Sequence, residues 1–138
     1  MFVYNHSLRV RYAETDQMGY VYYGNYATYY EVARAESLRS LGLSYKEVEE
    51  SGVIMPVLRN SSLYIKPARY DDLLDIKVIL KSLPQARITF HYEIYNSATL
   101  IHSGETTLVF VNKETFKPCK VPELMENALK PFFNEGKD

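Results

Sequence analysis

The sequence predicts an α+β fold in which a strongly curved antiparallel sheet of about five strands wraps around one long helix. One stretch that begins near Asn25 places its apolar residues at helical spacing, and it is the only long one in the first three quarters of the chain. Segments before and after it alternate apolar and polar residues with the period of a strand. Because each of these strands has an apolar face to cover, we expect the sheet to pack on the long helix.

Length and composition limit the classes of protein that this chain can be. With 138 residues, it is expected to form one domain spanning residues 1–138 that needs no disulfide or metal to hold its core. It carries 16 basic and 17 acidic side chains, for a net charge of −1. A nucleic-acid-binding protein usually shows a basic excess, so we expect no nucleic-acid partner.

The single cysteine and the hydropathy pattern bear on the location of the protein. Cys119 has no partner for an intramolecular disulfide, which fits a reducing compartment. The first residues lack the basic segment and apolar stretch of a signal peptide. No apolar run approaches the roughly 18 residues that a membrane helix requires. We therefore expect a cytoplasmic protein that does not bind a membrane.

The first quarter of the chain is predicted to hold a strand, a turn and the long helix. Residues 8–12 alternate apolar side chains with arginines, as a half-buried strand does. A turn-rich stretch then ends at Gly19, since glycine permits backbone conformations that other residues resist. The helical pattern follows from Asn25 to Leu41, and Gly42 is well placed to end it.

The remaining elements are one short helix, several strands and a terminal helix. Ser44 and Glu47 form a capping box, which predicts a short helix that starts there. Pro56 predicts an edge, bulge or bend, and Pro122 the start of the last helix. The strands are expected at residues 53–58, 62–66, 74–81, 86–95 and 106–111. Because such a sheet has exposed edges, we also expect the chain to self-associate.

The most polar and constrained stretch lies between the first strand and the long helix. It places Asp16 a few residues ahead of a helix N-terminus, whose N–H groups are unpaired and carry partial positive charge. Those groups can hold the negative oxygen that develops when a thioester carbonyl is attacked, while the carboxylate attacks or takes a proton from water. Gly24 would let a ligand approach the backbone closely. An aspartate in this position is also a common turn former or cap.

This stretch resembles the signature of the 4-hydroxybenzoyl-CoA thioesterase-like family of hot-dog-fold acyl-CoA thioesterases. The signature has an aspartate, a glycine three residues later, an apolar-aromatic run and an Asn-Tyr pair that opens the helix. The matching parts of this sequence are, in order, Thr15-Asp16, Gly19, Val21-Tyr22-Tyr23 and Asn25-Tyr26. The resemblance implies the hot-dog fold and hydrolysis of an acyl-CoA or aroyl-CoA thioester to the free acid and CoA, with neither metal nor organic cofactor.

The resemblance also implies roles for individual residues. Asp16 corresponds to the catalytic aspartate, acting as nucleophile or general base, and Tyr23 to the position whose backbone N–H polarises the carbonyl. One variant of the family carries histidine there and other members carry an aromatic residue, as here. A phenol does not easily replace imidazole as a proton shuttle, so we expect Tyr23 to act through its backbone. Tyr12 matches a tyrosine found in some members, where it positions the substrate or orients the aspartate; a core tyrosine at the end of the strand is the equal alternative. The substrate-binding residues are accordingly expected to be Tyr12, Gly19, Gly24 and Asn25.

Partners and alternatives remain to be distinguished. The family commonly forms dimers that pair into homotetramers, so a dimer or tetramer is expected. Arg59, Lys66 and Arg69 are candidates for contacting the CoA phosphates, although ordinary solvated charges are the more common explanation of such residues and we do not assign them to the site. A thioesterase that acts on acyl carrier protein and a non-catalytic module that binds a small ligand are the alternative functions. The sequence leaves the acyl group open, whether short, long or aromatic.

Overall fold

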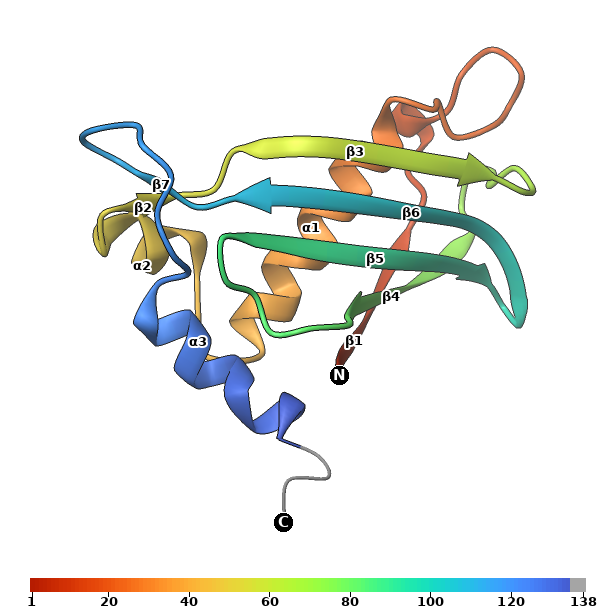
Figure 1. The fold of residues 1–138 in the computed structure, drawn as a ribbon. Coiled ribbons are helices and arrows are strands. Elements are labelled where there is room, and N and C mark those ends of the chain that lie inside the picture. The colour runs from red at the N-terminus through yellow and green to blue at the C-terminus, as the bar shows by residue number, and fades with distance from the viewer. Residues whose placement is uncertain (135–138) are drawn as a thin grey trace.

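The main sheet has five antiparallel strands that curve around helix α1 (Asn25–Arg39), which confirms the predicted α+β class (Figure 1). The computed structural model describes residues 1–134, so residues 135–138 of the expected domain lie outside the described residues. The strand order is β1-β4-β5-β6-β3, which makes β1 and β3 the edges. These strands are β1 (Phe2–Arg9), β3 (Val57–Tyr64), β4 (Leu73–Leu80), β5 (Arg87–Asn96) and β6 (Thr99–Val109).

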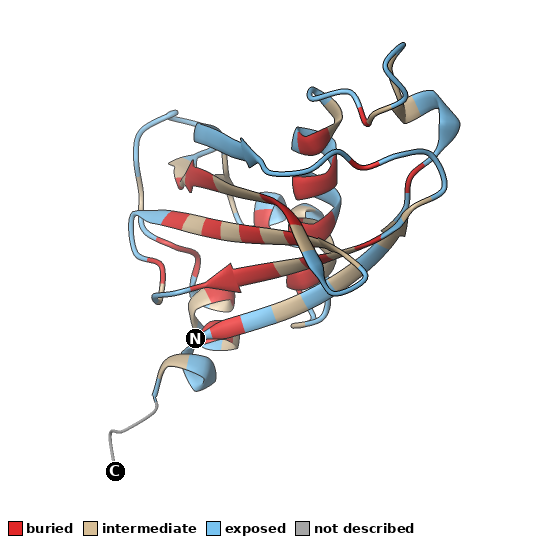
Figure 2. Ribbon diagram, turned by 90° about the vertical axis from the view of Figure 1, so that its right-hand side faces the viewer, coloured by how far each residue is buried: buried red, intermediate tan, exposed pale blue. Residues whose placement is uncertain are grey.

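Strand β5 shows most clearly how the sheet covers the helix. Its alternate residues Ile88, Phe90, Tyr92 and Ile94 are buried, and the residues between them are at least partly exposed. Figure 2 shows the resulting stripes of buried and less buried residues along the strands. Because side chains of a strand point to opposite faces in turn, one face of β5 forms the core under α1.

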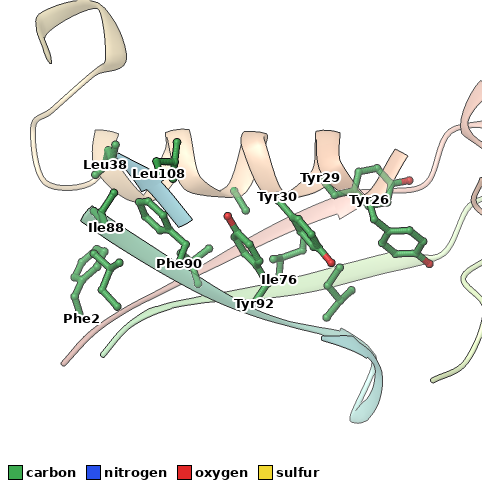
Figure 3. Close-up of a cluster of buried hydrophobic side chains, with 14 of the residues drawn as sticks. Phe2, Tyr26, Tyr29, Tyr30, Leu38, Ile76, Ile88, Phe90, Tyr92 and Leu108 are labelled. Atoms are coloured by element: carbon green, nitrogen blue, oxygen red, sulfur yellow. The ribbon is translucent and has the colours of Figure 1, made fainter. Parts of the chain in front are cut away.

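Tyrosines of α1 form the other side of this core. Tyr26, Tyr29 and Tyr30 are buried, and the rings of Tyr26 and Tyr30 point from the helix toward the sheet (Figure 3). The Tyr30 ring stacks on that of Tyr92 with their centroids 4.2 Å apart. A Cβ atom at Gly104 would lie 2.0 Å from the Tyr30 hydroxyl, so a glycine is needed on β6 for the helix to approach this closely.

Two strand predictions need correction. β1 begins at Phe2 and ends at Arg9, and Tyr12 lies in the 3-10 turn η1 (Tyr12–Glu14) rather than on a strand. The expected segments at 53–58 and 62–66 are a short strand β2 (Val53–Ile54) and the continuous β3, separated at Pro56. The break falls there because proline has no N–H to donate to a ladder.

The remaining elements close one end of the sheet. Ser44 accepts a hydrogen bond from the N–H of Glu47 (3.1 Å) and caps the short helix α2, as predicted. Gly42 and Gly52, which follow α1 and α2, have φ angles of +81° and +94°, where glycine is favoured. These smaller elements are α2 (Tyr45–Glu50), β7 (Val111–Asn112), α3 (Glu123–Leu129) and the 3-10 turn η2 (Lys130–Phe133).

Two features that would change the class of function are absent from residues 1–134. No helix among them has the length and apolar character needed to cross a bilayer. The same residues contain no group of three or more His, Cys, Asp or Glu side chains that could hold a metal ion.

Candidate active site

The Asp16 turn is held by hydrogen bonds to its own carboxylate and carbonyl. The Asp16 Oδ1 atom accepts from the N–H groups of Met18 (2.9 Å) and Tyr20 (3.3 Å). The Asp16 carbonyl accepts from the N–H of Gly19 (2.9 Å), whose φ of +82° explains the glycine in the turn. The other carboxylate oxygen, Oδ2, accepts no hydrogen bond from residues 1–134, so Asp16 forms the turn and still offers a free oxygen.

Two backbone N–H groups are free at the start of α1. The N–H of Tyr22 donates to the Glu14 carbonyl and that of Asn25 to the Tyr22 carbonyl, both at 2.9 Å. Between them, the N–H groups of Tyr23 and Gly24 have no acceptor within the described part of the chain. Since the N-terminus of a helix carries partial positive charge, these two donors suit a developing oxyanion.

A pocket of about 280 Å³ joins the Asp16 turn to the helix start and to the segment after β3. This volume lies just below the range of typical small-molecule sites. Aromatic and aliphatic side chains form its walls, and Asp16 and Lys66 bring the charges. Its lining consists of Asp16, Met18, Tyr20, Val21, Tyr23, Tyr26, Tyr64, Ile65, Lys66 and Pro67.

Asp16 and Tyr23 line this pocket, whereas the four expected substrate-binding residues do not. Tyr12 is 77% exposed and packs edge-to-face on Tyr70, with ring centroids 5.6 Å apart. Gly19 shapes the turn, and a Cβ atom at Gly24 would lie 2.7 Å from the Tyr22 ring. The Asn25 side chain donates to the Glu14 carbonyl at 2.8 Å. The two glycines and Asn25 thus build the loop around the pocket.

Sequence reasoning missed the walls of the pocket. Tyr26 is buried against the ring of His102, 4.0 Å away and parallel, and burial raises the pKa of Tyr26 to about 12. Tyr64 lies edge-on to the same tyrosine at 5.5 Å. Tyr26 had a signal in the Asn-Tyr pair that opens the helix. Lys66 was named only as a candidate contact for the CoA phosphates, and no local pattern marked Tyr64, Ile65 and Pro67 as pocket residues, because they lie about 40 residues after Tyr26 in the chain.

His102 forms a buried network beneath this wall. Its Nε2 atom is hydrogen bonded to the Tyr30 hydroxyl, which lies 2.6 Å from the hydroxyl of Ser62. Burial lowers the pKa of His102 to about 4, so the ring is neutral at neutral pH. Its Nδ1 atom has no hydrogen-bond partner within residues 1–134. The ring is fully buried, and it is not one of the residues that line the pocket.

The three candidate basic residues differ in their relation to the pocket. Lys66 lines it. The Arg69 guanidinium lies over the ring of the pocket residue Tyr20, 5.0 Å from its centroid. Arg59 lies on β3, and it is exposed but is not part of the lining. Lys66 and Arg69 are therefore better placed than Arg59 to meet an anion that enters the pocket.

A second cavity, of about 320 Å³, lies over strands β3 to β6 and shares no residue with the first. Its lining includes Lys81, Glu93 and the pair formed by His91 and Glu105, whose Nδ1 and Oε2 atoms are 3.7 Å apart. Burial and the nearby Lys81 lower the pKa of His91 more than Glu105 raises it. None of the Asp16 turn or the helix start borders this cavity, so the candidate active site is the first pocket.

Chemically, the first pocket brings the Asp16 carboxylate and Tyr23, whose backbone N–H has no acceptor within residues 1–134, into aromatic surroundings. A carbonyl oxygen at the donors would be polarised, and the carboxylate could attack the carbonyl carbon or take a proton from water. A carboxylate and an oxyanion donor are the groups that the transfer of an acyl group to water requires. It requires only side chains and backbone groups that the chain itself supplies.

Three comparisons with known proteins point in the same direction. Residues 10–129 match the family model described as "Thioesterase-like superfamily". YneP of Bacillus subtilis strain 168 is 36% identical over 121 residues, covering 87% of this chain and 88% of that protein. The acyl-CoA thioester hydrolase YbgC of Escherichia coli O157:H7 is 33% identical over 117 residues, covering 84% and 87%. The crystal structure of DHNA-CoA thioesterase from Staphylococcus aureus has a TM-score of 0.82 at 34% identity, covering 98% and 86%.

Proposed function

Because this chain belongs to the thioesterase-like superfamily and is a thioester hydrolase, we propose that it cleaves acyl-CoA thioesters with Asp16 as its catalytic carboxylate. Its fold is the hot-dog fold, as the resemblance implied. One observation carries the catalytic assignment: Asp16, with a free Oδ2 atom, lines the same pocket as Tyr23, whose backbone N–H is also free. Hydrolysis needs a group that brings in water or attacks, and a donor for the oxyanion.

The proposed reaction begins when the thioester carbonyl oxygen accepts a hydrogen bond from the backbone N–H of Tyr23, with the neighbouring N–H of Gly24 as a second donor beside the pocket. Asp16 then acts in one of two ways. As a base it takes a proton from water, whose oxygen attacks the carbonyl carbon; the tetrahedral intermediate expels CoA thiolate, and the proton on Asp16 passes to the sulfur. As a nucleophile it forms an anhydride and expels the thiolate, and water then cleaves the anhydride. Either route consumes one water and yields the acid and CoA.

We further propose that the enzyme works as a homo-oligomer, a dimer or tetramer, whose copies meet at β3. All eight residues of β3 are exposed in the single chain although they form an edge of the main sheet. An edge strand offers unpaired backbone groups that another strand can pair with. Its apolar side chains Val57, Leu58 and Leu63 are each more than half exposed, which favours burial against a second copy. The cytoplasmic location predicted from Cys119 remains a prediction.

The test is thiol release from a panel of acyl-CoA and aroyl-CoA esters, with acylated carrier protein as a further substrate. Asp16→Asn keeps the shape of the side chain and removes its charge, so we expect the rate to fall by about 10²-fold or more. Asp75→Asn is the matched control, because Asp75 is hydrogen bonded to Ser7 on β1 and is not a pocket residue. Its rate should stay near that of the wild type.

Each alternative gives its own result. If Asp16→Asn cleaves as fast as the wild type, the assignment of Asp16 is wrong. If the wild type cleaves only the carrier-protein thioester, the substrate class is wrong. A wild type that binds acyl-CoA without releasing thiol would support the ligand-binding alternative.

A further inference from the structure

Glu14 lies two residues before Asp16 and has a carboxylate whose two oxygens are both occupied. Its side chain is 13% exposed. Oε1 accepts from the backbone N–H of Arg11 (2.8 Å) and from the hydroxyl of Tyr29 (3.0 Å). Oε2 accepts from the guanidinium of Arg11 at 3.1 Å. The carboxylate therefore joins the loop to the buried face of α1, where Tyr29 is 2% exposed.

The backbone carbonyl of Glu14 makes a second connection to the helix start. It accepts from the Asn25 side chain (2.8 Å) and from the N–H of Tyr22 (2.9 Å). Asn25 and Tyr29 are four residues apart on α1, so they lie on the same face of the helix, one turn from each other. Glu14 thus holds that face at two points, with its carbonyl at the first turn and its carboxylate at the second.

Charge strengthens the contact between the Glu14 carboxylate and the Tyr29 hydroxyl. Burial raises the pKa of Glu14, but hydrogen bonds from Arg11 and Tyr29 lower it by more, so the net shift is downward from 4.5 and the group is ionised at neutral pH. Burial and the neighbouring carboxylate raise the pKa of Tyr29, which keeps its proton and donates it. Hydrogen bonds to an ionised acceptor are roughly twice as strong as neutral ones. Arg11 is exposed, so its ion pair adds little stability.

We propose that Glu14 is a positioning residue for the thioester cleavage: it fixes the start of α1 against the Asp16 turn. The carboxylate of Asp16 and the free N–H groups of Tyr23 and Gly24 belong to two different elements and must meet one carbonyl group. Glu14 lies two residues before Asp16 in the chain, and it is hydrogen bonded to α1, which directly follows the two N–H groups. This inference rests on the proposed function and adds a residue to it. Glu14 itself does not react, since both its oxygens are already occupied.

The experiment removes the hydrogen bond between α1 and Glu14 by changing the residue on the helix. Tyr29→Phe removes only the hydroxyl that binds Glu14, and its ring still fills the core. A misplacement of about 1 Å costs a reaction about 10²-fold, so we expect kcat to fall at least about tenfold while KM changes less than about twofold. Tyr92→Phe is the matched control: it removes another buried tyrosine hydroxyl, one that accepts from Arg34 (3.1 Å) away from the pocket.

Variants of Glu14 and Tyr29 together form a double-mutant cycle. Glu14→Ala should lower kcat at least as much as Tyr29→Phe, and Glu14→Gln should restore part of it, because an amide oxygen still accepts from the hydroxyl. Side chains that act through one contact are non-additive, so adding Tyr29→Phe to Glu14→Ala should cost little more. Melting temperatures measured for all variants separate a positional effect from a loss of folded protein.

The outcomes separate this inference from the function on which it rests. A wild type that cleaves no thioester overturns both. A wild type that cleaves, with Tyr29→Phe retaining its kcat or losing no more than Tyr92→Phe does, overturns the positioning role and leaves the catalytic assignment of Asp16 intact. If Glu14→Ala fails to fold, the comparison of Tyr29→Phe with Tyr92→Phe still decides.

Discussion

Tyr23 shows how one residue can belong to a site through its backbone. Its side chain is 66% exposed and lies against Tyr22, with ring centroids 4.7 Å apart. Its N–H has no acceptor in the described chain, while its carbonyl accepts from the N–H of Tyr26 at 3.3 Å. The part of Tyr23 that the proposed chemistry uses is therefore a group that every residue except proline possesses.

Substitutions of Tyr23 can separate the backbone from the side chain. Tyr23→Pro deletes an N–H that lies ahead of α1, outside the helix and its N-cap Gly24, so we expect a loss in kcat of about 10²-fold, as for other oxyanion donors. Tyr23→Phe keeps the N–H and loses only the hydroxyl, and its kcat should stay much closer to that of the wild type. Thiol release by both variants, with circular dichroism as a check of folding, measures this. Equal losses in the two would contradict the backbone role.

Of the residues that line the pocket, the sequence pointed to Asp16 and Tyr23 as catalytic and to Lys66 as a candidate contact for an anion, and it did not assign the rest of the lining to the site. The spacing of Asp16, Gly19 and the Asn25-Tyr26 pair is local, and local spacing is visible in a sequence. Tyr64 reaches the pocket only because the sheet curves until the end of β3 lies beside α1. Tyr12 was expected to end a strand, but the chain turns at residue 10 and leaves Tyr12 exposed. Such placements depend on tertiary packing, which no short pattern encodes.

Among the elements, those with strong periodicity were predicted best. Strand β5 alternates cleanly and was placed almost to the residue, and α1 ends just before Gly42 as expected. β3 was split in two in the prediction because its side chains carry no consistent alternation. That irregularity has a physical reason: neither face of β3 is fully buried in the single chain, so burial imposes no pattern on it.

The exposed edge strand β3 leads to a prediction about assembly. Leu63 is 61% exposed, and Leu63→Lys would place a charge in the proposed interface between copies, where an unpaired buried charge is costly. We expect this variant to elute as a monomer in size-exclusion chromatography with light scattering, whereas the wild type elutes as a dimer or tetramer. Val3→Lys, at a 40% exposed position on the other edge strand β1, is the control and should keep the wild-type state. A monomeric wild type would contradict the proposed assembly.

At the scale of the whole molecule, polar groups lie deep in the core between sheet and helix. His102 is fully buried, with Tyr26, Tyr30 and Tyr64 around its ring. Arg34 is 7% exposed and donates to the hydroxyls of Tyr45 and Tyr92, both at 3.1 Å. Buried polar groups favour one packing arrangement over others when they are paired, and they are costly when they are not. Among the described residues, His102 finds a partner at one nitrogen only, so its protonation bears on the stability of the entire fold.

Burial holds the pKa of His102 at about 4 in the folded chain, against 6.5 when it is exposed. Between these values the unfolded chain binds the proton and the folded chain does not, so stability is fully present above the unfolded pKa and is lost as pH falls toward the folded one. From about pH 7.5 to about pH 5, His102 alone should remove about 2 kcal/mol from the free energy of unfolding.

Urea denaturation at both pH values, in the wild type and in His102→Gln, isolates this contribution. Glutamine can still donate to Tyr30 but does not titrate, and effects of the carboxylates and of His91 are common to both proteins. We expect the wild type to lose about 2 kcal/mol more than the variant over this range, since each unit of pKa shift is worth about 1.4 kcal/mol. The same pH dependence in both proteins would mean that His102 accepts its proton in the folded state as readily as in water.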